Sequence, residues 1–266
     1  MDNLSQKQLE ETATAYEELL VPALFQEWAD RLAKMDGIKA SHKILDVACG
    51  TGVLARAVAR QLPGSSVTGI DLNPGMLAVA SKHAPTIDWQ QGSAEELPFG
   101  NESFDTVLSQ FGLMLFSSPK TALMEMKRVL KPGGTLIVAV FDSIKQIPVY
   151  EKMADLFARK VDSSVGEALR FPFSMGDTDK LYSLFSENGL SDPKITTEKG
   201  VARFSSPRHM VLSDVKGWFP FAQIQLDDQM IESIVEEAET VLEPFQSVDG
   251  EVQIDVSVHI IKAHKF

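Results

Sequence analysis

Residues 43–52 constrain the fold of this chain more than any other stretch. The apolar run 43–47 passes directly into the turn 48–52, with the sequence Ala-Cys-Gly-Thr-Gly, and a helical pattern follows. Ala48, Gly50 and Gly52 place no long side chain between the backbone and a ligand, and glycine readily takes positive φ. A strand, turn and helix in this order predict an α/β fold with a cofactor site at the end of the first strand.

The turn alone leaves the cofactor open. Gly50, Gly52 and Ala55 match the relaxed G-x-G-x-x-G/A pattern of dinucleotide enzymes. The next predicted strand, 66–71, ends in Asp71, about 20 residues further on, where a carboxylate can bind ribose hydroxyls. Both features indicate a nucleoside cofactor, and an NAD-dependent oxidoreductase remains an alternative.

Asp46 favours a cofactor with a cationic part. Its carboxylate, four residues before Gly50, repels a pyrophosphate but tolerates the amino group of an amino-acid moiety. Two further motifs follow later predicted strands, at 91–99 (Gln-Gly-Ser-Ala-Glu-Glu-Leu-Pro-Phe) and at 128–136 (Arg-Val-Leu-Lys-Pro-Gly-Gly-Thr-Leu).

With these four ordered motifs, the chain resembles class I S-adenosylmethionine-dependent methyltransferases, the broad group that includes ubiquinone/menaquinone C-methyltransferases. The resemblance is close over 40–142. It implies a doubly wound α/β fold with a mostly parallel seven-stranded sheet in the order 3-2-1-4-5-7-6, the last strand antiparallel. It also implies S-adenosylmethionine as cofactor and methyl transfer to a small-molecule acceptor by in-line displacement. A non-catalytic S-adenosylmethionine-binding protein is a further alternative.

Hydrophobic periodicity gives the expected elements. Helical spacing over 7–35 predicts N-terminal helices, which Pro22 should break or kink into two. The expected strands are 43–48, 66–71, 86–91, 104–110, 134–141, 193–203 and 252–263. The expected helices are 53–62, 74–83, 118–130 and 177–188.

We expect one domain over 1–266, with an N-terminal helical lid at 1–38 and a cofactor-binding core at 40–142. The insertions 143–175 and 205–249 interrupt the strand-helix alternation and are expected to cover the substrate pocket as a helical cap. Their many aromatic residues fit either an apolar acceptor or simple packing of the cap on the core.

The resemblance also assigns roles in cofactor binding. Asp46 and the turn should hold the methionine portion, Asp71 the ribose hydroxyls, and Leu72 should flank the adenine. The predicted cofactor-binding residues are Tyr16, Asp46, Ala48, Gly50, Gly52, Asp71, Leu72, Met76, Ser93, Ala94 and Gln110.

Three of these residues leave their roles open. Ser93 stands where many relatives have an aspartate that binds the adenine amino group, and a hydroxyl accepts that bond more weakly. Tyr16 either contacts the methionine end or packs on the sheet edge. Gln110 binds the cofactor, binds the acceptor or serves as a structural amide.

A general base is optional in this reaction, because the leaving group is already activated and alignment can supply most of the acceleration. For a hydroxyl or an acidic carbon as acceptor, a base would help. The candidates are His209, Asp142 and Tyr150.

Composition excludes several other classes. The net charge of −12 argues against a nucleic-acid partner. Cys49 is the single cysteine, so neither an intramolecular disulfide nor a multi-cysteine metal site can form, and no metal is expected. No run of 18 apolar residues predicts a membrane span, and the polar start of the chain predicts a cytoplasmic protein. The sequence is silent on oligomeric state.

Overall fold

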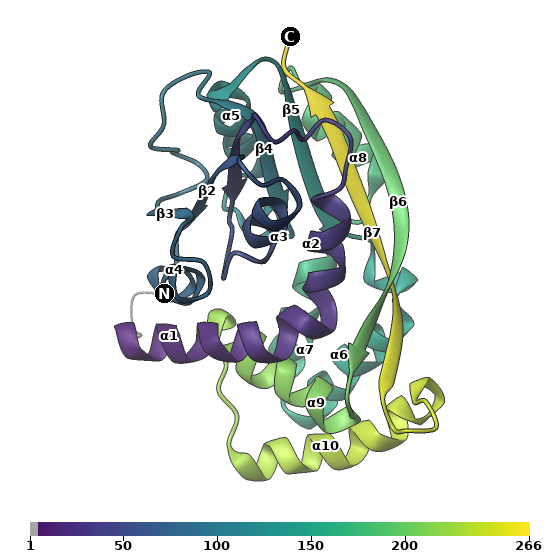
Figure 1. The fold of residues 1–266 in the computed structure, drawn as a ribbon. Helices are drawn as coiled ribbons and strands as arrows, with labels where there is room; N and C mark the ends of the chain where they lie inside the picture. The colour runs from purple at the N-terminus through teal and green to yellow at the C-terminus, as the bar shows by residue number, and fades with distance from the viewer. Residues whose placement is uncertain (1–4) are drawn as a thin grey trace.

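The central element is a seven-stranded sheet with the order β3-β2-β1-β4-β5-β7-β6 (Figure 1). The computed structural model describes residues 5–266, so residues 1–4 of the predicted lid lie outside the described part. β7 pairs antiparallel with both β5 and β6, and the other neighbours are parallel. The predicted order and the antiparallel last strand are confirmed. The strands are β1 (Lys43–Val47), β2 (Ser66–Asp71), β3 (Asp88–Gln91), β4 (Phe104–Gln110), β5 (Leu130–Phe141), β6 (Ser191–Phe204) and β7 (Val252–His264).

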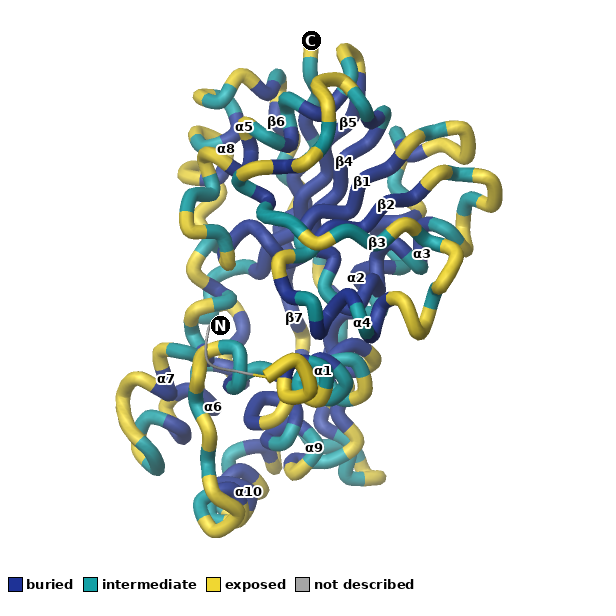
Figure 2. The backbone as a smooth tube through the Cα atoms, turned by 90° about the vertical axis from the view of Figure 1, so that its left-hand side faces the viewer, coloured by how far each residue is buried: buried dark blue, intermediate teal, exposed yellow. Residues whose placement is uncertain are grey.

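Burial explains which strands form the centre. β1, β4 and β5 are almost entirely buried, as the dark tubes of Figure 2 show, because both faces of a parallel sheet are covered. In the register, Leu45 of β1 lies opposite Thr68 of β2 and Val107 of β4. β3, at the edge, has only half-buried and exposed residues.

Helices cover both faces of the sheet. α2 and α3 lie in front of it in the view of Figure 1, and α5 and α8 lie behind it. Asn73 caps α4 by accepting from the Gly75 N–H at 2.8 Å, and Ser118 caps α5 through the Thr121 N–H at 3.2 Å. The bounds are α2 (Gln26–Leu32), α3 (Val53–Gln61), α4 (Pro74–His83), α5 (Pro119–Val129) and α8 (Thr178–Ser186).

The N-terminal helical run bends but does not break at Pro22. α1 (Gln6–Ala15) continues through a π-helical segment (Tyr16–Phe25) into α2, and the run changes direction there (Figure 1). Pro22 lies inside the π-helical segment. Proline has no N–H to donate, and the wider π turn accommodates its ring without ending the helix. The kink is confirmed, whereas a complete break is not observed.

The remaining helices gather with α1 at the carboxyl ends of the parallel strands, at the bottom of Figure 1. They come from the two predicted insertions, and the second insertion also contains a second π-helical segment, Ser213–Trp218. The helices are α6 (Pro148–Lys160), α7 (Ser163–Arg170), α9 (Pro207–Leu212) and α10 (Asp228–Leu242).

One strand starts earlier than the sequence pattern suggested. β5 begins at Leu130 instead of 134, because Leu130 already pairs with Phe104 of β4. The Gly133 N–H also donates to the Lys265 carbonyl at 2.6 Å, which extends the pairing through the glycine turn.

Within residues 5–266, no helix is both long and apolar enough to cross a membrane. The same part of the chain brings no three His, Cys, Asp or Glu side chains together in a metal-binding cluster.

Candidate functional site

The turn after β1 has a left-handed backbone at three positions. Ala48, Gly50 and Gly52 have φ of 56°, 55° and 83°. A Cβ at Gly50 would meet no atom within 4 Å, whereas a Cβ at Gly52 would lie 2.3 Å from the Trp89 ring. Gly50 therefore leaves open space for a ligand, and Gly52 makes room for an indole of β3. The sequence suggested the same role for both glycines. No pattern in it indicated that the Trp89 ring packs against Gly52.

Asp71, at the end of β2, is bonded to the same turn. One carboxylate oxygen accepts from the Gly50 N–H and the other from the Asn73 N–H, both at 2.8 Å. Burial raises the pKa of Asp71, and these backbone hydrogen bonds oppose the shift. The carboxylate thus fixes the turn and still offers lone pairs to hydroxyl donors.

Asp46 is the second buried acid of the site, with 1% of its surface exposed. Its Oδ2 accepts from the Ala55 N–H in the first turn of α3 at 3.0 Å. Burial raises the pKa of Asp46 to about 8, the Ala55 N–H opposes the shift, and Asp71 adds to it. Burial therefore favours the neutral form of this carboxyl.

A narrow cavity of about 30 Å³ lies against the turn. Tyr16 and Phe25, from the N-terminal π-helical segment, close one side of it, and Gln110 at the end of β4 closes another. The Gln110 amide donates to the Phe25 carbonyl at 3.2 Å. Five predicted cofactor residues meet around this cavity, namely Tyr16, Asp46, Ala48, Gly50 and Gln110.

Polar atoms at the cavity lack partners. Within the described chain, Thr51 Oγ1 and Gln110 Oε1 are buried and make no hydrogen bond. Buried polar groups are almost always paired in native proteins. The two atoms therefore indicate a place where a polar ligand binds.

Contacts of Glu17 hold the N-terminal segment over the site. Glu17 contacts Arg56 of α3 at 2.6 Å and His83 of α4 at 3.8 Å. The Tyr16 ring stacks on Phe25 at 5.2 Å, and burial, followed by the charges of Asp71 and Glu17, raises the pKa of its hydroxyl. Tyr16 thus lines the cavity and also packs on Phe25. This position is compatible with both predicted roles, contact with the methionine end of the cofactor and packing on the sheet edge.

The remaining predicted cofactor residues lie outside the cavity lining. Leu72, next to Asp71, exposes 54% of its surface. Met76 is buried against Ala13, between α4 and α1. The Ser93 Oγ accepts from the Glu95 N–H at 3.1 Å in the loop after β3, and Ala94 beside it is buried.

The three predicted bases lie apart from the cavity, and none of them lines it. Asp142, after β5, accepts from the Ser257 hydroxyl at 2.9 Å and contacts the His259 ring at 3.1 Å, so its oxygens serve a buried network. The His209 Nδ1 accepts from the Ser205 N–H at 3.1 Å, and burial lowers its pKa.

Tyr150, the third candidate, lies on α6 inside the cap, and its hydroxyl has no partner among the described residues. Asp214, in the second π-helical segment, is equally buried, and its Oδ2 has no hydrogen-bond partner there. Sequence reasoning missed Asp214. The available signal was a single acid within the apolar stretch 210–221.

Comparison with known proteins connects this site with a family. Residues 45–138 match the family described as "Methyltransferase domain". The chain is 32% identical over 188 residues to the demethylmenaquinone methyltransferase of Staphylococcus aureus, covering 65% of this chain and 78% of that one. It is 43% identical over 119 residues to the demethylmenaquinone methyltransferase of Chlorobaculum parvum, covering 45% and 48%. The chain thus spans about half the length of several curated relatives it matches.

A solved structure shares the fold. The phosphoethanolamine N-methyltransferase 2 of Haemonchus contortus, in complex with phosphomonomethylethanolamine and S-adenosylhomocysteine, superposes with a TM-score of 0.60 at 19% identity, covering 95% of this chain and 56% of that one.

The sheet order, the turn after β1 and these matches define the class: the chain belongs to the class I S-adenosylmethionine-dependent methyltransferases. The family's cofactor is S-adenosylmethionine, and the dinucleotide alternative is not favoured.

Proposed function

We propose that this protein transfers a methyl group from S-adenosylmethionine to a small acceptor with an apolar, flat surface. The observation that carries the proposal is the placement of two buried acids and an open glycine at one end of the sheet. Asp71 is bonded to the Gly50 N–H, and Asp46 lies behind the same turn.

The residues fit the donor group by group. Asp71 can accept from both ribose hydroxyls, because its backbone bonds leave lone pairs free. Asp46 suits the cationic amino group, and a cation would lower its raised pKa. Gly50 gives the donor access to the backbone, and the unpaired Thr51 hydroxyl can meet its polar atoms.

The adenine side is assigned on position alone. Leu72 offers an exposed apolar face next to Asp71, and the loop with Ser93 and Ala94 follows the neighbouring strand. The Ser93 oxygen accepts from the Glu95 N–H and keeps a second lone pair, which can accept from the adenine amino group. Met76 packs against Ala13 of α1, and Gly52 makes room for the Trp89 ring. Both residues therefore act on this side through packing.

In the reaction, the donor supplies an activated methyl group on a sulfonium. The protein aligns the two reactants and excludes water, which is where most of the acceleration in such a displacement arises. Tyr16 and Phe25 form the water-excluding wall, and Gln110 fixes its position through the Phe25 carbonyl.

An aromatic row leads from the cavity into the cap and supports a flat, apolar acceptor. Neighbouring rings lie between 4.0 and 5.7 Å apart, and Phe111 and Phe141 are stacked within 6° of parallel. Aromatic rings prefer stacked and edge-to-face contacts with other rings, so a planar acceptor can stack on a ring of this row. The row consists of Tyr16, Phe25, Phe111, Phe141, Phe173 and Tyr150. The names of the sequence relatives, demethylmenaquinone methyltransferases, point to the same kind of acceptor.

The proposal includes a cytoplasmic location and no nucleic-acid partner. A single cysteine favours a reducing compartment, and a net charge of −12 opposes binding to phosphate backbones.

Transfer of a labelled methyl group tests the function. The protein is incubated with methyl-labelled S-adenosylmethionine and a panel of reduced, demethylated quinones and simple phenols, and organic-phase label is counted. We expect label in at least one acceptor with the wild-type protein and none with Asp71→Ala. Equal transfer by both proteins would contradict the assigned donor site.

A further inference from the structure

Arg128, in the last turn of α5, uses every N–H group of its guanidinium. Its Nε and one terminal nitrogen donate to the two carboxylate oxygens of Glu125, at 2.6 and 2.7 Å. The same terminal nitrogen donates to the Leu97 carbonyl at 2.9 Å. The other terminal nitrogen donates to the Phe99 carbonyl at 2.7 Å and to the Asn101 side-chain oxygen at 3.0 Å. All donors of the guanidinium are therefore satisfied, and most of them bind the loop between β3 and β4.

Glu125 completes the clamp on this loop. The Leu97 N–H donates to its Oε2 at 2.8 Å, so both backbone groups of one buried residue are bonded to the same ion pair. The hydrogen bond from Arg128 lowers the pKa of Glu125, burial opposes the shift, and the Leu97 N–H adds to it. A planar guanidinium and a planar carboxylate in this paired arrangement fix direction as well as distance. Leu97 is thus held in one position relative to α5.

The clamped residue lies close to the start of its own loop. Ser93 and Glu96 form an isolated antiparallel bridge, in which the Glu96 N–H donates to the Ser93 carbonyl at 3.2 Å. A Cβ at Gly92 would lie 3.4 Å from the Pro98 ring. The segment 92–98 therefore folds back on itself, and the position of Leu97 determines that of Ser93.

This start of the loop adjoins the proposed donor site. Gln91, the last residue of β3, lies opposite Asp71 in the register with β2. The Gly92 N–H donates to the Asp71 carbonyl at 3.0 Å. Ser93 and Ala94 follow directly, beside the carboxylate that we assign to the ribose.

We propose that Arg128 and Glu125 are positioning residues for the adenine end of the donor site. They hold the segment 92–98 so that the Ser93 oxygen accepts from the adenine amino group and the Ala94 N–H donates to the neighbouring ring nitrogen. Both act through the backbone of Leu97. This inference rests on the proposed methyl transfer, because it takes S-adenosylmethionine as the ligand.

A pair of ligands that differ only in the purine tests this role. S-inosylhomocysteine carries a carbonyl oxygen where S-adenosylhomocysteine has the amino group, and an N–H where adenine has the acceptor nitrogen. Both proposed hydrogen bonds are lost with it, whereas the ribose and amino-acid parts are unchanged. We expect wild-type protein to bind S-adenosylhomocysteine about 10-fold more tightly than S-inosylhomocysteine by calorimetry.

Arg128→Lys should remove most of this preference. Lysine keeps the positive charge, but its donors radiate from one atom and cannot reach the carboxylate and the loop carbonyls together. We expect the ratio of the two affinities to fall to about 2-fold or less. Arg170→Lys is the matched control. Arg170 is paired with two acids of the cap and its side chain is 26% exposed, against 31% for Arg128, so the ratio should stay at the wild-type value.

Glu125→Gln is the milder second variant. Its amide oxygen can still accept from the Leu97 N–H, but the charge that orients Arg128 is lost. We expect a ratio of about 3-fold. The ratio is the decisive readout because a purely structural role would lower the melting temperature and weaken both ligands equally.

The outcomes are separable. A wild-type ratio in both Arg128→Lys and Glu125→Gln overturns the positioning role, whatever their melting temperatures. Equal binding of the two ligands by wild type overturns it as well, while S-adenosylhomocysteine binding itself still supports the donor site. Failure of S-adenosylhomocysteine to bind wild type removes the proposed function, and the positioning role with it.

Discussion

The buried acids beside the turn after β1 and the buried acid in the cap differ in their hydrogen bonds. At the turn after β1, Asp71 and Asp46 are bonded to backbone N–H groups of Gly50, Asn73 and Ala55. In the cap, the Asp214 side chain has no such bond in the described chain. The difference shows that backbone N–H groups hold the two acids at the turn in place, whereas Asp214 is surrounded by buried side chains alone.

The largest expected effect comes from removing the acid that joins the turn to β2. Asp71→Ala deletes the acceptor for two backbone N–H groups and for the ribose, each worth about 1.5–3 kcal/mol as hydrogen bonds to a charged group. We expect at least about a 100-fold loss of S-adenosylhomocysteine affinity by calorimetry, with a lower melting temperature.

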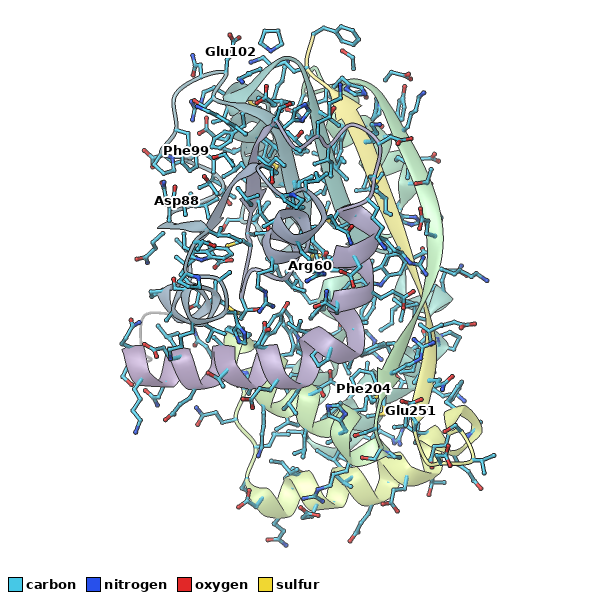
Figure 3. The ribbon with its side chains drawn as sticks, viewed as in Figure 1. Arg60, Asp88, Phe99, Glu102, Phe204 and Glu251 are labelled. Atoms are coloured by element: carbon cyan, nitrogen blue, oxygen red, sulfur yellow. The ribbon has the colours of Figure 1, made fainter. Side chains whose placement is uncertain are left out.

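Asp88→Ala is the matched control. Asp88 is an exposed acid at the start of the edge strand β3 (Figure 3). Unchanged affinity is expected for this variant, and a similar loss in both would show that the effect is not specific to Asp71.

The two glycines of the turn should separate folding from binding. Gly52→Ala forces a Cβ into the Trp89 ring and a left-handed backbone on alanine, for a loss of about 3 kcal/mol in the free energy of unfolding. Gly50→Ala meets open space, so its stability loss is limited to about 1 kcal/mol of backbone strain. Its Cβ enters the donor's space, and we expect about a 10-fold weaker affinity for S-adenosylhomocysteine.

Urea unfolding and calorimetry on both glycine variants measure the two effects. The reverse pattern, with Gly50→Ala the less stable protein, would contradict the assignment of Gly52 to packing.

Asp46 should make the free protein less stable as the pH rises. Its folded pKa of about 8 lies above that of an aspartate in the unfolded chain, about 3.9, so its contribution to stability is full below about pH 4 and is lost as pH rises through 8. Asp46→Asn keeps an acceptor for the Ala55 N–H and removes this dependence. The variant should therefore melt higher than wild type at about pH 9, with little difference at about pH 4.

The same variant should bind S-adenosylmethionine more weakly, since the cationic amino group loses its counter-charge. Melting curves at both pH values and calorimetry check these results. A melting difference that is independent of pH would show that Asp46 is not buried in its neutral form.

Leu72→Ala gives the smallest effect. The side chain is 54% exposed, so its truncation should leave the melting temperature within about 1 °C, because exposed sites usually change stability little. Loss of apolar contact with the adenine should weaken S-adenosylhomocysteine binding about 3-fold to 10-fold. Leu115→Ala, at another half-exposed leucine, is the control and should bind normally.

The strand, the turn after β1 and the sheet around them were predictable because their signals are local. The strand 43–47, the glycine turn and Asp71 lie in short, ordered motifs, and the family resemblance supplied the sheet order. The different roles of Gly50 and Gly52 were not predictable, since they depend on where Trp89 lies after β2 and β3 pair.

The cap was less predictable because its features depend on distant contacts. Asp214 is buried only because its segment packs on the N-terminal lid and on α7, almost 200 residues and about 50 residues away in sequence. The partners of Asp142 likewise come from β7, which no short motif connects with the end of β5.

The most direct test of the central claim is calorimetric titration of the wild-type protein with S-adenosylhomocysteine, and separately with NADH. The structure predicts saturable one-site binding of S-adenosylhomocysteine and no heat of binding for NADH. Binding of NADH alone would contradict the assignment of Asp46, Gly50 and Asp71 to a methyl-donor site.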